Sequence, residues 1–353
     1  MTLIFTDFNP LYMKKLSILL LSLSFIACKT AQKTQNTTFG IDETSVTYTQ
    51  YINENDLKKH LYIIAADSMQ GRNTGEIGQQ KARDYIVTYY KSIGIAPPKT
   101  MQSYFQQVPS AFMKSRFSPK LNDADNILAF IEGTDKKDEI IVISAHYDHV
   151  GMKNGEVYNG ADDNGSGTVA LLEMAEAFAK AVKMGHKPRR SVLFLHVIGE
   201  EHGLHGSRYY AENPVFPLAN TIVDINIDMV GRIDDVYKTE GNYIYVIGAD
   251  RLSTELHQIN EEINTKFSNL KLDYTFNDVN DPNEYYYRSD HYNFAKKGIP
   301  SIFFFNGVHA DYHQEGDEPQ KILYPILAKR TQHFFRLAWQ LANQEKRIVA
   351  DKK

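Results

Sequence analysis

The chain has 353 residues, of which 42% are apolar and 23% are charged, and its formal net charge is −4. These fractions are typical of a globular protein with one or two domains, and composition alone does not decide between them. The negative net charge gives no sign of a basic surface for a phosphate backbone, which argues against nucleic acid as a partner.

The N-terminal segment has the pattern of an export signal. Lys14 and Lys15 precede an apolar run, Leu16–Ala27, which ends at Cys28, the only cysteine of the chain. The run is shorter than the roughly 20 apolar residues that a membrane-spanning helix needs. A short apolar run behind basic residues is typical of a signal peptide, so we predict that residues 1–27 are removed by cleavage before Cys28.

The end of this signal, Phe25-Ile26-Ala27-Cys28, resembles a bacterial lipobox, in which the cysteine sulfur carries a diacylglyceryl group. It predicts a protein that is exported and anchored to a bacterial membrane through a lipid on Cys28. The alternative is an ordinary signal peptide followed by an incidental cysteine. Residues 1–12 fit no basic region of a signal and are interpreted as an upstream extension of the reading frame. Residues 28–44 are predicted to form a polar, flexible tether.

After the tether, the first predicted elements are two helices. Apolar residues recur at helical spacing over 56–66 and 76–93, and Gly94 with the prolines at 97 and 98 ends the second helix. The region 99–125 has no regular pattern and is predicted to be irregular.

Further along, short apolar runs alternate with helical patterns. Several runs are apolar almost throughout, which is typical of central strands buried on both faces. The predicted strands are 126–131, 139–144, 191–198, 221–227, 243–247 and 301–305. The predicted helices are 167–183, 251–266 and 322–343. This alternation predicts an α/β fold with a single domain over residues 45–353, in which a mostly parallel central sheet lies between helix layers.

Potential metal-binding residues follow four of the predicted strands. They lie in the segments His146–His149, Glu200–His202, Asp228 and His309–His313, and a further segment, Asp162–Gly167, precedes a helix. In open sheets, ligands bind beyond the carboxyl ends of the strands, so we expect these side chains at one edge. So many acids are costly to bury together unless cations neutralise them. Nitrogen and oxygen donors without a thiolate favour zinc, with manganese or cobalt as alternatives.

Five segments in this order resemble the zinc aminopeptidase family, which includes bacterial leucine aminopeptidases, glutamate carboxypeptidase and glutaminyl cyclases. The segments are SAHYDHVG, NGADDNGSG, VIGEEHGLHGS, INIDMVGR and ADYHQEGD, and SDH at Ser289–His291 and GIP at Gly298–Pro300 add to the likeness. Each motif alone is weak, but their order is specific. The resemblance covers most of residues 56–343 and implies a zinc exopeptidase fold of the phosphorylase/hydrolase-like type. It also implies a bare catalytic domain, without the inserted protease-associated domain that many members carry.

The resemblance implies two zinc ions per chain. The five implied ligands are His146, Asp163, Glu201, Asp228 and His313. His146 and Asp228 would belong to one ion, Glu201 and His313 to the other, and Asp163 to both. Three carboxylates offset most of the charge of two dications, and this makes the arrangement physically reasonable.

The bridging position is assigned to Asp163 rather than to Asp162. In the family, the bridging Asp lies three residues before the serine of the Gly-Ser-Gly turn, which is Ser166 here. The peptide bond after this Asp is cis in the family. The resemblance therefore also implies a cis bond between Asp163 and Asn164.

Catalytic roles are implied for three further residues. Glu200, next to the ligand Glu201, would take a proton from the metal-activated water and pass it to the leaving amine. Asp148 would hydrogen-bond the His146 imidazole and orient it. Tyr312 resembles the tyrosine that hydrogen-bonds the tetrahedral oxyanion, and its alternative role is packing. The other histidines near the ligands are interpreted as supporting or surface residues: His149, His202, His205 and His309.

These features predict a metal-dependent exopeptidase, namely an aminopeptidase that removes N-terminal residues from peptides. Two alternatives remain open. A glutaminyl cyclase would use similar ligands, although cyclases tend to lack the full Asp-Asn-Gly-Ser-Gly stretch found at residues 163–167. A non-catalytic binding module of the same fold would lack the catalytic apparatus, which this chain retains. Carboxypeptidase or dipeptidase specificity also fits the same metal framework.

Overall fold

The computed structural model describes residues 39–114 and 120–352. The predicted signal peptide, the lipid site Cys28 and most of the tether therefore lie outside the described residues. The end of the predicted tether lies against the domain. The Asp42 carboxylate accepts a hydrogen bond from the indole of Trp339 at 2.7 Å, and the backbone N–H of Asp42 donates to the side chain of Gln340 at 2.8 Å. The folded part thus includes Asp42, ahead of residue 45, because its polar groups pair with the last helix.

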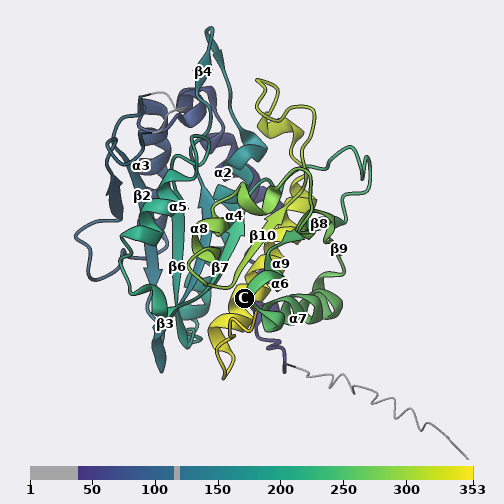
Figure 1. Cartoon of the computed structure of the whole chain (residues 1–353). Helices are drawn as coiled ribbons and strands as arrows, with labels where there is room; N and C mark the ends of the chain where they lie inside the picture. Colours follow the sequence, from purple (N-terminus) through teal and green to yellow (C-terminus); the bar gives the residue numbers. More distant parts are fainter. Residues whose placement is uncertain (1–38, 115–119, 353) are drawn as a thin grey trace, which may run out of the picture. The chain divides into compact units, whose positions relative to one another are not determined.

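One eight-stranded sheet forms the centre of the described domain (Figure 1). Its strand order is β1-β2-β6-β3-β7-β10-β8-β9. The strands are β1 (Phe105–Val108), β2 (Ala124–Ile131), β3 (Lys136–His146), β6 (Arg190–Val197), β7 (Thr221–Ile227), β8 (Tyr243–Ile247), β9 (Lys271–Asp273) and β10 (Ser301–Phe305). The neighbours β6, β3, β7 and β10 run parallel, whereas β2 and β8, which flank them, run antiparallel to their neighbours in this set. This confirms the predicted α/β fold with a mostly parallel central sheet.

Helices cover both faces of the sheet (Figure 1). On one face, α4 and α9 pack with α2 and α3, and on the other face α5 and α8 pack. The helices are α1 (Ser45–Thr49), α2 (Glu54–Ile64), α3 (Ile77–Ser92), α4 (Gly167–Lys183), α5 (His205–Glu212), α6 (Ala249–Leu252), α7 (Thr254–Ile263), α8 (His291–Ala295) and α9 (Tyr324–Asn343). A small hairpin of β4 (Met152–Lys153) and β5 (Glu156–Val157) projects at the top of the view.

Alternate residues of β3 face opposite helix layers. Ile141 and Ile143 belong to the core under α4 and α9, whereas Ile140 and Val142 belong to the core under α5 and α8. Because successive side chains of a strand point to opposite faces, a strand covered on both faces needs apolar residues at every position. This is the physical reason for the unbroken apolar runs that predicted the strands.

Some predicted boundaries agree with the structure and others differ. The bounds of β7, β8, β10 and α4 agree with the prediction. The predicted helix 251–266 is divided at Ser253, whose φ of −137° is extended and whose side chain caps α7 by accepting the N–H of Leu256 at 3.3 Å. The region 99–125, predicted to be irregular, contributes the edge strand β1. This strand is only partly buried, so it has no continuous apolar run.

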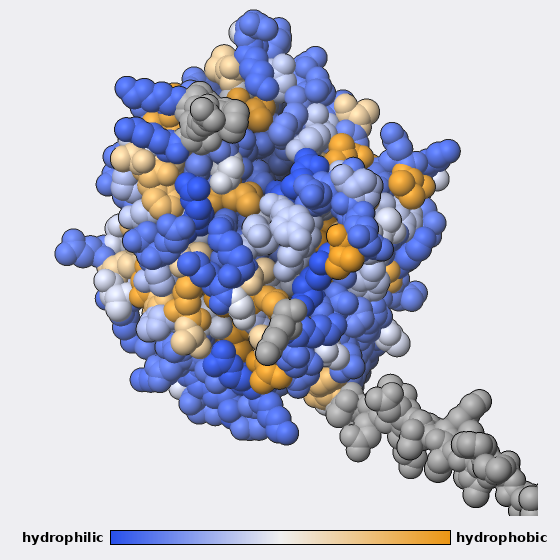
Figure 2. All heavy atoms as spheres, viewed as in Figure 1, coloured by the Kyte–Doolittle hydropathy of each residue, from blue (hydrophilic) through white to orange (hydrophobic). Residues whose placement is uncertain are grey.

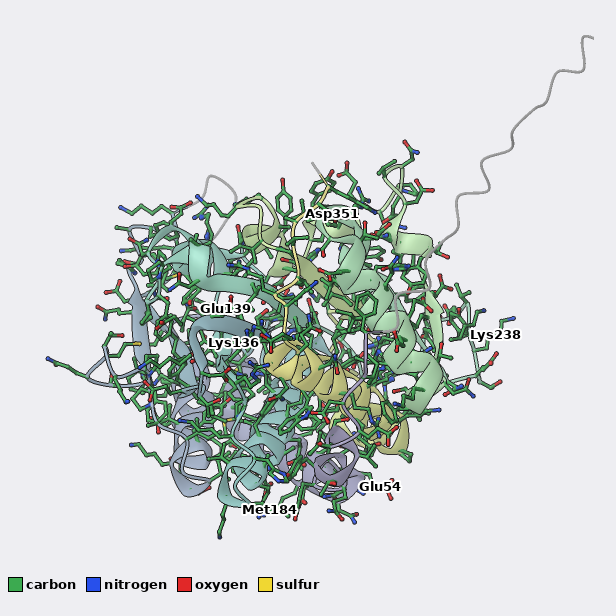
Figure 3. The ribbon with its side chains drawn as sticks, turned by 90° about the horizontal axis from the view of Figure 1, so that it is seen from below. Glu54, Lys136, Glu139, Met184, Lys238 and Asp351 are labelled. Carbon is green, nitrogen blue, oxygen red and sulfur yellow. The ribbon has the colours of Figure 1, made fainter. Side chains whose placement is uncertain are left out.

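Ion pairs hold the end of the sheet where β3 begins. Figure 3 views this end from below and labels Lys136 and Glu139 of β3. Lys136 lies 3.1 Å from Glu345, and Glu139 lies 2.6 Å from Arg190. Each of these acids has a basic partner, in contrast to the acids that gather at the other end of the strands.

The face of the domain in Figure 2 is largely hydrophilic, and its apolar residues lie in small scattered groups. Two of the most exposed large apolar side chains are Val236 and Val279, which are 73% and 74% exposed. In the part of the chain that the structure describes, no helix is both long and apolar enough to cross a bilayer.

Glu173 of α4 predicts a measurable pH dependence of stability. Its buried carboxylate makes no hydrogen bond within the described residues and lies 3.4 Å from His60 Nε2. Burial, opposed by His60, raises the pKa of Glu173 from 4.5 to about 6. Because the folded state binds this proton more tightly than the unfolded chain does, stability falls as the pH rises from about 4.5 through 6. This group should cost about 2 kcal/mol over that range, and Glu173→Gln should remove that dependence.

Denaturant unfolding of both proteins at several pH values measures the effect. The matched control is Glu176→Gln on the same helix, whose carboxylate accepts a hydrogen bond from Tyr89 at 2.7 Å and lies 3.3 Å from Lys180. It should leave the fall in stability between pH 4.5 and 6 in place. An unchanged fall in Glu173→Gln would contradict the prediction.

Candidate metal centre and active site

Loops at the carboxyl ends of four central strands gather acids and imidazoles. His146 is the last residue of β3, and Asp228 follows β7 directly. Glu201 lies in the loop after β6, and His313 lies in the loop after β10. Asp163 comes from the turn before α4. The structure therefore brings all five implied ligands to one edge of the sheet, because the strands that carry four of them are neighbours.

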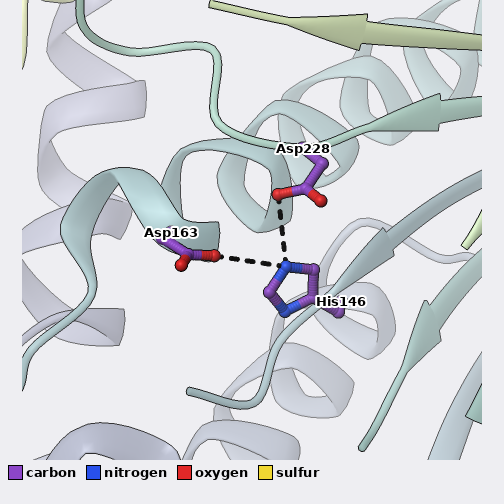
Figure 4. Close-up of side chains that lie close together, drawn as sticks. All are labelled: His146, Asp163 and Asp228. Atoms are coloured by element: carbon purple, nitrogen blue, oxygen red, sulfur yellow. Dashed lines mark hydrogen bonds and ion pairs between the residues drawn. The ribbon is translucent and has the colours of Figure 1, made fainter. Parts of the chain in front are cut away.

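His146, Asp163 and Asp228 form the first group (Figure 4). His146 Nε2 lies 3.4 Å from Asp163 Oδ1 and 3.2 Å from Asp228 Oδ1. The other ring nitrogen, Nδ1, lies 3.2 Å from the backbone carbonyl oxygen of Asp148, which orients the ring. All three side chains are buried. One imidazole nitrogen carries at most one proton, so two carboxylates around it are better suited to share a cation than to share that proton.

The second group surrounds the other oxygen of Asp163. His313 Nε2 lies 3.0 Å from Asp163 Oδ2 and 2.8 Å from Glu201 Oε2. His149 also lies in this group, with Nδ1 2.7 Å from Glu201 Oε1 and 3.8 Å from Asp163 Oδ2. The second group thus offers two imidazoles and two carboxylates, where the sequence implied a single imidazole.

Asp163 presents one oxygen to each group, as a bridging ligand would. Asp162 points elsewhere: its Oδ1 accepts the N–H of Gly231 at 2.7 Å, and its Oδ2 lies 3.2 Å from His309 Nε2. The geometry therefore agrees with the choice of Asp163 over Asp162. The peptide bond between Asp163 and Asn164 is cis, which confirms the expectation from the resemblance.

The turn that carries Asp163 is held by Asp317, which is fully buried. The Asp317 carboxylate accepts the backbone N–H groups of Asp162 and Asp163, each at 3.0 Å. Gly160, at the start of the turn, has a φ of +53° and lies so close to the Asp163 carbonyl and the His149 ring that a Cβ has no room. These contacts position Asp163 through its backbone, so its carboxylate remains free to bind a cation.

The donor set fits a transition metal. It consists of imidazole nitrogens and carboxylate oxygens without thiolate, which suits zinc. His313 Nε2 lies within 3.0 Å of carboxylate oxygens of both Asp163 and Glu201, so all three side chains could hold one cation. Burial alone would lower the pKa of His313, but these two carboxylates raise it to about 10. Because a ligand imidazole must be neutral, protons compete with the metal at this residue.

Glu200 lies beside the first group, with Oε2 3.9 Å from His146 Nε2. Burial, opposed by His146 and reinforced by Glu201, raises the pKa of Glu200 well above its ordinary value. The Asp148 carboxylate lies 3.7 Å from His146 Nδ1, and it accepts hydrogen bonds from the Thr74 hydroxyl at 2.7 Å and the backbone N–H of Glu200 at 3.4 Å. Asp148 therefore contacts the imidazole mainly through its backbone carbonyl, and its carboxylate positions the loop that carries Glu200.

A small, partly open cavity lies beside the two groups. It is lined by Asp163, Glu200, Asp228, Arg288, Met229, Tyr285, Phe303, Phe305, Val308 and Tyr312. The ring of Tyr312 stacks on that of His313, with centroids 4.0 Å apart. Burial and the neighbouring carboxylates raise the pKa of Tyr312, so its hydroxyl stays protonated and can donate a hydrogen bond. The cavity combines charged side chains with apolar and aromatic ones, which is suited to a small ligand or a substrate side chain.

Two residues of the site were not identified from the sequence. His149 follows His146 by three residues, a spacing that does not distinguish a ligand from a supporting residue, and only the loop conformation places it beside Glu201. Asp317 lies in the same loop as His313, but its bonds to the turn of Asp163 span more than 150 residues of sequence. The other nearby histidines pair outside the two groups: His202 with Asn73, His205 with Arg208 and His309 with Asp162.

The fold is of the α/β class, and its site gathers imidazole and carboxylate donors that could hold metal ions. Residues 126–338 match peptidase family M28, and the chain belongs to this family of metallopeptidases. A probable leucine aminopeptidase of Trichophyton verrucosum is 30% identical over 225 residues, which are 62% of this chain and 57% of that protein. A probable zinc metalloprotease of Pyrenophora teres f. teres is 31% identical over 169 residues, which are 45% of this chain and 32% of that protein. The chain thus spans between about a third and somewhat over half of the length of these relatives.

Solved structures share the fold. LapB from Legionella pneumophila has a TM-score of 0.67 at 18% identity, over 85% of this chain and 75% of that chain. BSAP, a zinc aminopeptidase from Bacillus subtilis, has a TM-score of 0.63 at 16% identity, over 86% of this chain and 99% of that chain. Glutaminyl cyclase from Porphyromonas gingivalis has a TM-score of 0.63 at 19% identity, over 81% of this chain and 97% of that chain. At these identities the likeness shows the fold alone, which is common to peptidases and cyclases.

Proposed function

We propose that the chain is a zinc aminopeptidase that holds two metal ions and removes N-terminal residues from peptides. The observation that carries the proposal is the position of Asp163, whose two oxygens face two separate groups of buried donors. The first ion would be held by His146, Asp163 and Asp228. The second would be held by Asp163, Glu201 and His313, with His149 close enough to take part. Manganese or cobalt would suit the same donors.

The residues beside these groups supply proton transfer and substrate contacts. Zinc bound there would provide Lewis-acid activation of a water molecule and of the peptide carbonyl. Glu200, whose pKa is raised by burial, is basic enough to take a proton from the attacking water and pass it to the leaving amine. The Tyr312 hydroxyl can donate a hydrogen bond to the oxygen that becomes negative. The cavity would hold the side chain of the first residue.

Glutaminyl cyclase activity is the second candidate, because the same fold carries it. Two features favour hydrolysis over cyclisation. The chain keeps the complete Asp-Asn-Gly-Ser-Gly stretch at residues 163–167, and its second donor group is as complete as its first. A non-catalytic role is disfavoured, because buried acids are costly to retain without a cation to neutralise them.

Metal content and product analysis on one preparation test the proposal. The metal-loaded protein should contain two zinc ions per chain by elemental analysis and should release leucine from leucinamide. One metal per chain with conversion of glutaminyl amide to its pyroglutamyl product would contradict the proposal and support the cyclase. No turnover of either compound by the fully loaded protein would support a binding module.

We further propose that the protein is exported and held on a bacterial membrane by a lipid on Cys28. The apolar run and the lipobox-like residues before Cys28 support this, and all of them lie outside the described residues. Cys28→Ser should abolish labelling by a radioactive fatty acid and move the protein from the membrane fraction to the soluble fraction. Thr30→Ser, two residues away, is the matched control and should label as the parent does. Undiminished labelling of Cys28→Ser would contradict the proposal.

A further inference from the structure

Arg288 is the one cationic residue that lines the cavity, and it has no acidic partner within ion-pairing distance in the described ranges. We propose that Arg288 forms a carboxylate-binding subsite, so that the enzyme prefers peptides that carry a carboxylate close to the cleaved bond. This inference rests on the proposed aminopeptidase function and adds the substrate class to it.

The backbone at Arg288 is fixed next to the metal groups. Its neighbour Ser289 is buried and donates a hydrogen bond from its hydroxyl to Asp228 Oδ2 at 2.7 Å. Arg288 therefore begins one residue away from a side chain that holds an implied metal ligand. Its guanidinium carbon lies 4.7 Å from the ring centroid of Tyr285, which also lines the cavity. The base of the side chain and its charged end are thus both held at the cavity wall.

The side chain of Arg288 is exposed, so an anion in the cavity can reach its guanidinium. Its hydrogen bond to the Asn283 carbonyl is long, at 3.4 Å. Stacking on an aromatic face leaves the edge of the guanidinium plane available, and this edge binds carboxylates through two parallel hydrogen bonds. Other arginines around the site are engaged: Arg232 lies 2.9 Å from Asp311, and the buried Arg72 donates to four backbone carbonyls. Arg288 contacts the Asn283 carbonyl and the Tyr285 ring, but within the described residues no carboxylate lies in ion-pairing distance of it.

The charge of the site also favours an anionic substrate group. Four carboxylates belong to the two donor groups and the proton carrier: Asp163, Glu200, Glu201 and Asp228. Their four negative charges equal the four positive charges of two divalent ions. Arg288 then remains as the uncompensated charge of the cavity lining, whose other members are apolar residues and tyrosines. A carboxylate would pair with it, and a neutral group would leave it unpaired.

A peptide can present this carboxylate in two ways. It can be the side chain of an N-terminal aspartate or glutamate, or it can be the C-terminal carboxylate of a dipeptide. Both have the same chemistry, and matched compounds separate them. Glutamic acid α-amide and glutamine α-amide differ only in the side-chain carboxylate, and Leu-Leu and Leu-Leu-amide differ only in the C-terminal one.

The test compares kcat/KM of the metal-loaded wild type, Arg288→Gln and Arg288→Lys on these two pairs, by release of the first amino acid. Arg288→Gln should lower kcat/KM by about 10- to 100-fold for the carboxylate member of one pair, mainly through KM. The neutral member should change by less than about threefold. Arg288→Lys should lie in between, because an ammonium binds a carboxylate without the two-point geometry. The compound pair whose kcat/KM ratio changes in Arg288→Gln shows whether Arg288 binds the side-chain or the C-terminal carboxylate.

Arg251→Gln is the matched control. Its guanidinium also lies over a tyrosine, 4.6 Å from the Tyr286 ring centroid, but it donates to the Asn277 carbonyl at 2.7 Å and lines a different cavity. It should leave the ratio within each pair unchanged. Equal losses for both members of both pairs in Arg288→Gln, or unchanged ratios, would overturn the proposal.

Binding separates a failure of this proposal from a failure of the proposed function. Calorimetry in the metal-loaded Glu200→Gln background gives the Kd of all four compounds with and without Arg288→Gln. An Arg288-dependent preference for one carboxylate without turnover by the wild type would keep the subsite and overturn aminopeptidase activity. Turnover by the wild type without an Arg288-dependent preference in Kd or KM would keep the activity and overturn the subsite.

Discussion

Glu200→Gln is expected to keep both metal ions and to lose about 10²- to 10⁴-fold in kcat. The substitution keeps the shape of the side chain but removes its ability to accept a proton. Glu200 lies 3.9 Å from His146 Nε2 and belongs to neither donor group, so the metals keep their ligands. Elemental analysis checks the metal content and kcat for leucinamide checks the loss of turnover, and both are measured on the same sample.

The neighbouring Glu201→Gln is the comparison that makes this result specific. Glu201 lies in the second group, between His149 and His313, so its loss should lower the metal content toward one ion per chain. The two adjacent substitutions should thus differ in metal content. Glu200→Gln should keep both ions with little turnover, whereas Glu201→Gln should lose metal. Near-normal turnover by metal-replete Glu200→Gln would refute its role as proton carrier.

Asp163→Asn is expected to lose both metal ions and, with them, all measurable turnover. Among the described residues, the Asp163 carboxylate is the side chain that belongs to both groups, with Oδ1 3.4 Å from His146 and Oδ2 3.0 Å from His313. An amide has no negative charge and only one good donor oxygen, so it cannot serve two cations. Zinc content after dialysis against a weak chelator, together with kcat for leucinamide, checks the expectation.

The fold of this variant should persist without metal. Asp317 holds the turn through the backbone N–H of Asp163 at 3.0 Å, and this bond does not depend on the substituted carboxylate. The midpoint of thermal unfolding in excess chelator should therefore be close to that of the wild type under the same conditions. His313→Ala, which removes a ligand from one group only, should keep about one ion. Retention of two ions by Asp163→Asn would show that the bridging assignment is wrong.

The central architecture could be predicted from the pattern of the sequence, and the ligand set was implied by the resemblance to the zinc aminopeptidase family. Residues 221–227 and 301–305 could be predicted as strands because a strand covered on both faces has to be apolar throughout. His146 and Asp228 could be placed at one edge because each directly ends or follows such a strand, and parallel neighbours end at the same edge. These inferences depend on local pattern and on the order of elements, which are properties of the chain alone.

Features that depend on loop conformation and on contacts between distant segments could be found only in the folded structure. His149 was interpreted as a supporting residue and lies 2.7 Å from Glu201, because the loop after β3 turns back toward the loop after β6. Asp317 binds a turn more than 150 residues away, and Arg288, which lines the cavity, is next to Ser289, whose hydroxyl is bonded to Asp228. Sequence periodicity carries no information on such contacts. They arise from side-chain hydrogen bonds between loops, whose partners become neighbours only when the sheet and both helix layers have assembled.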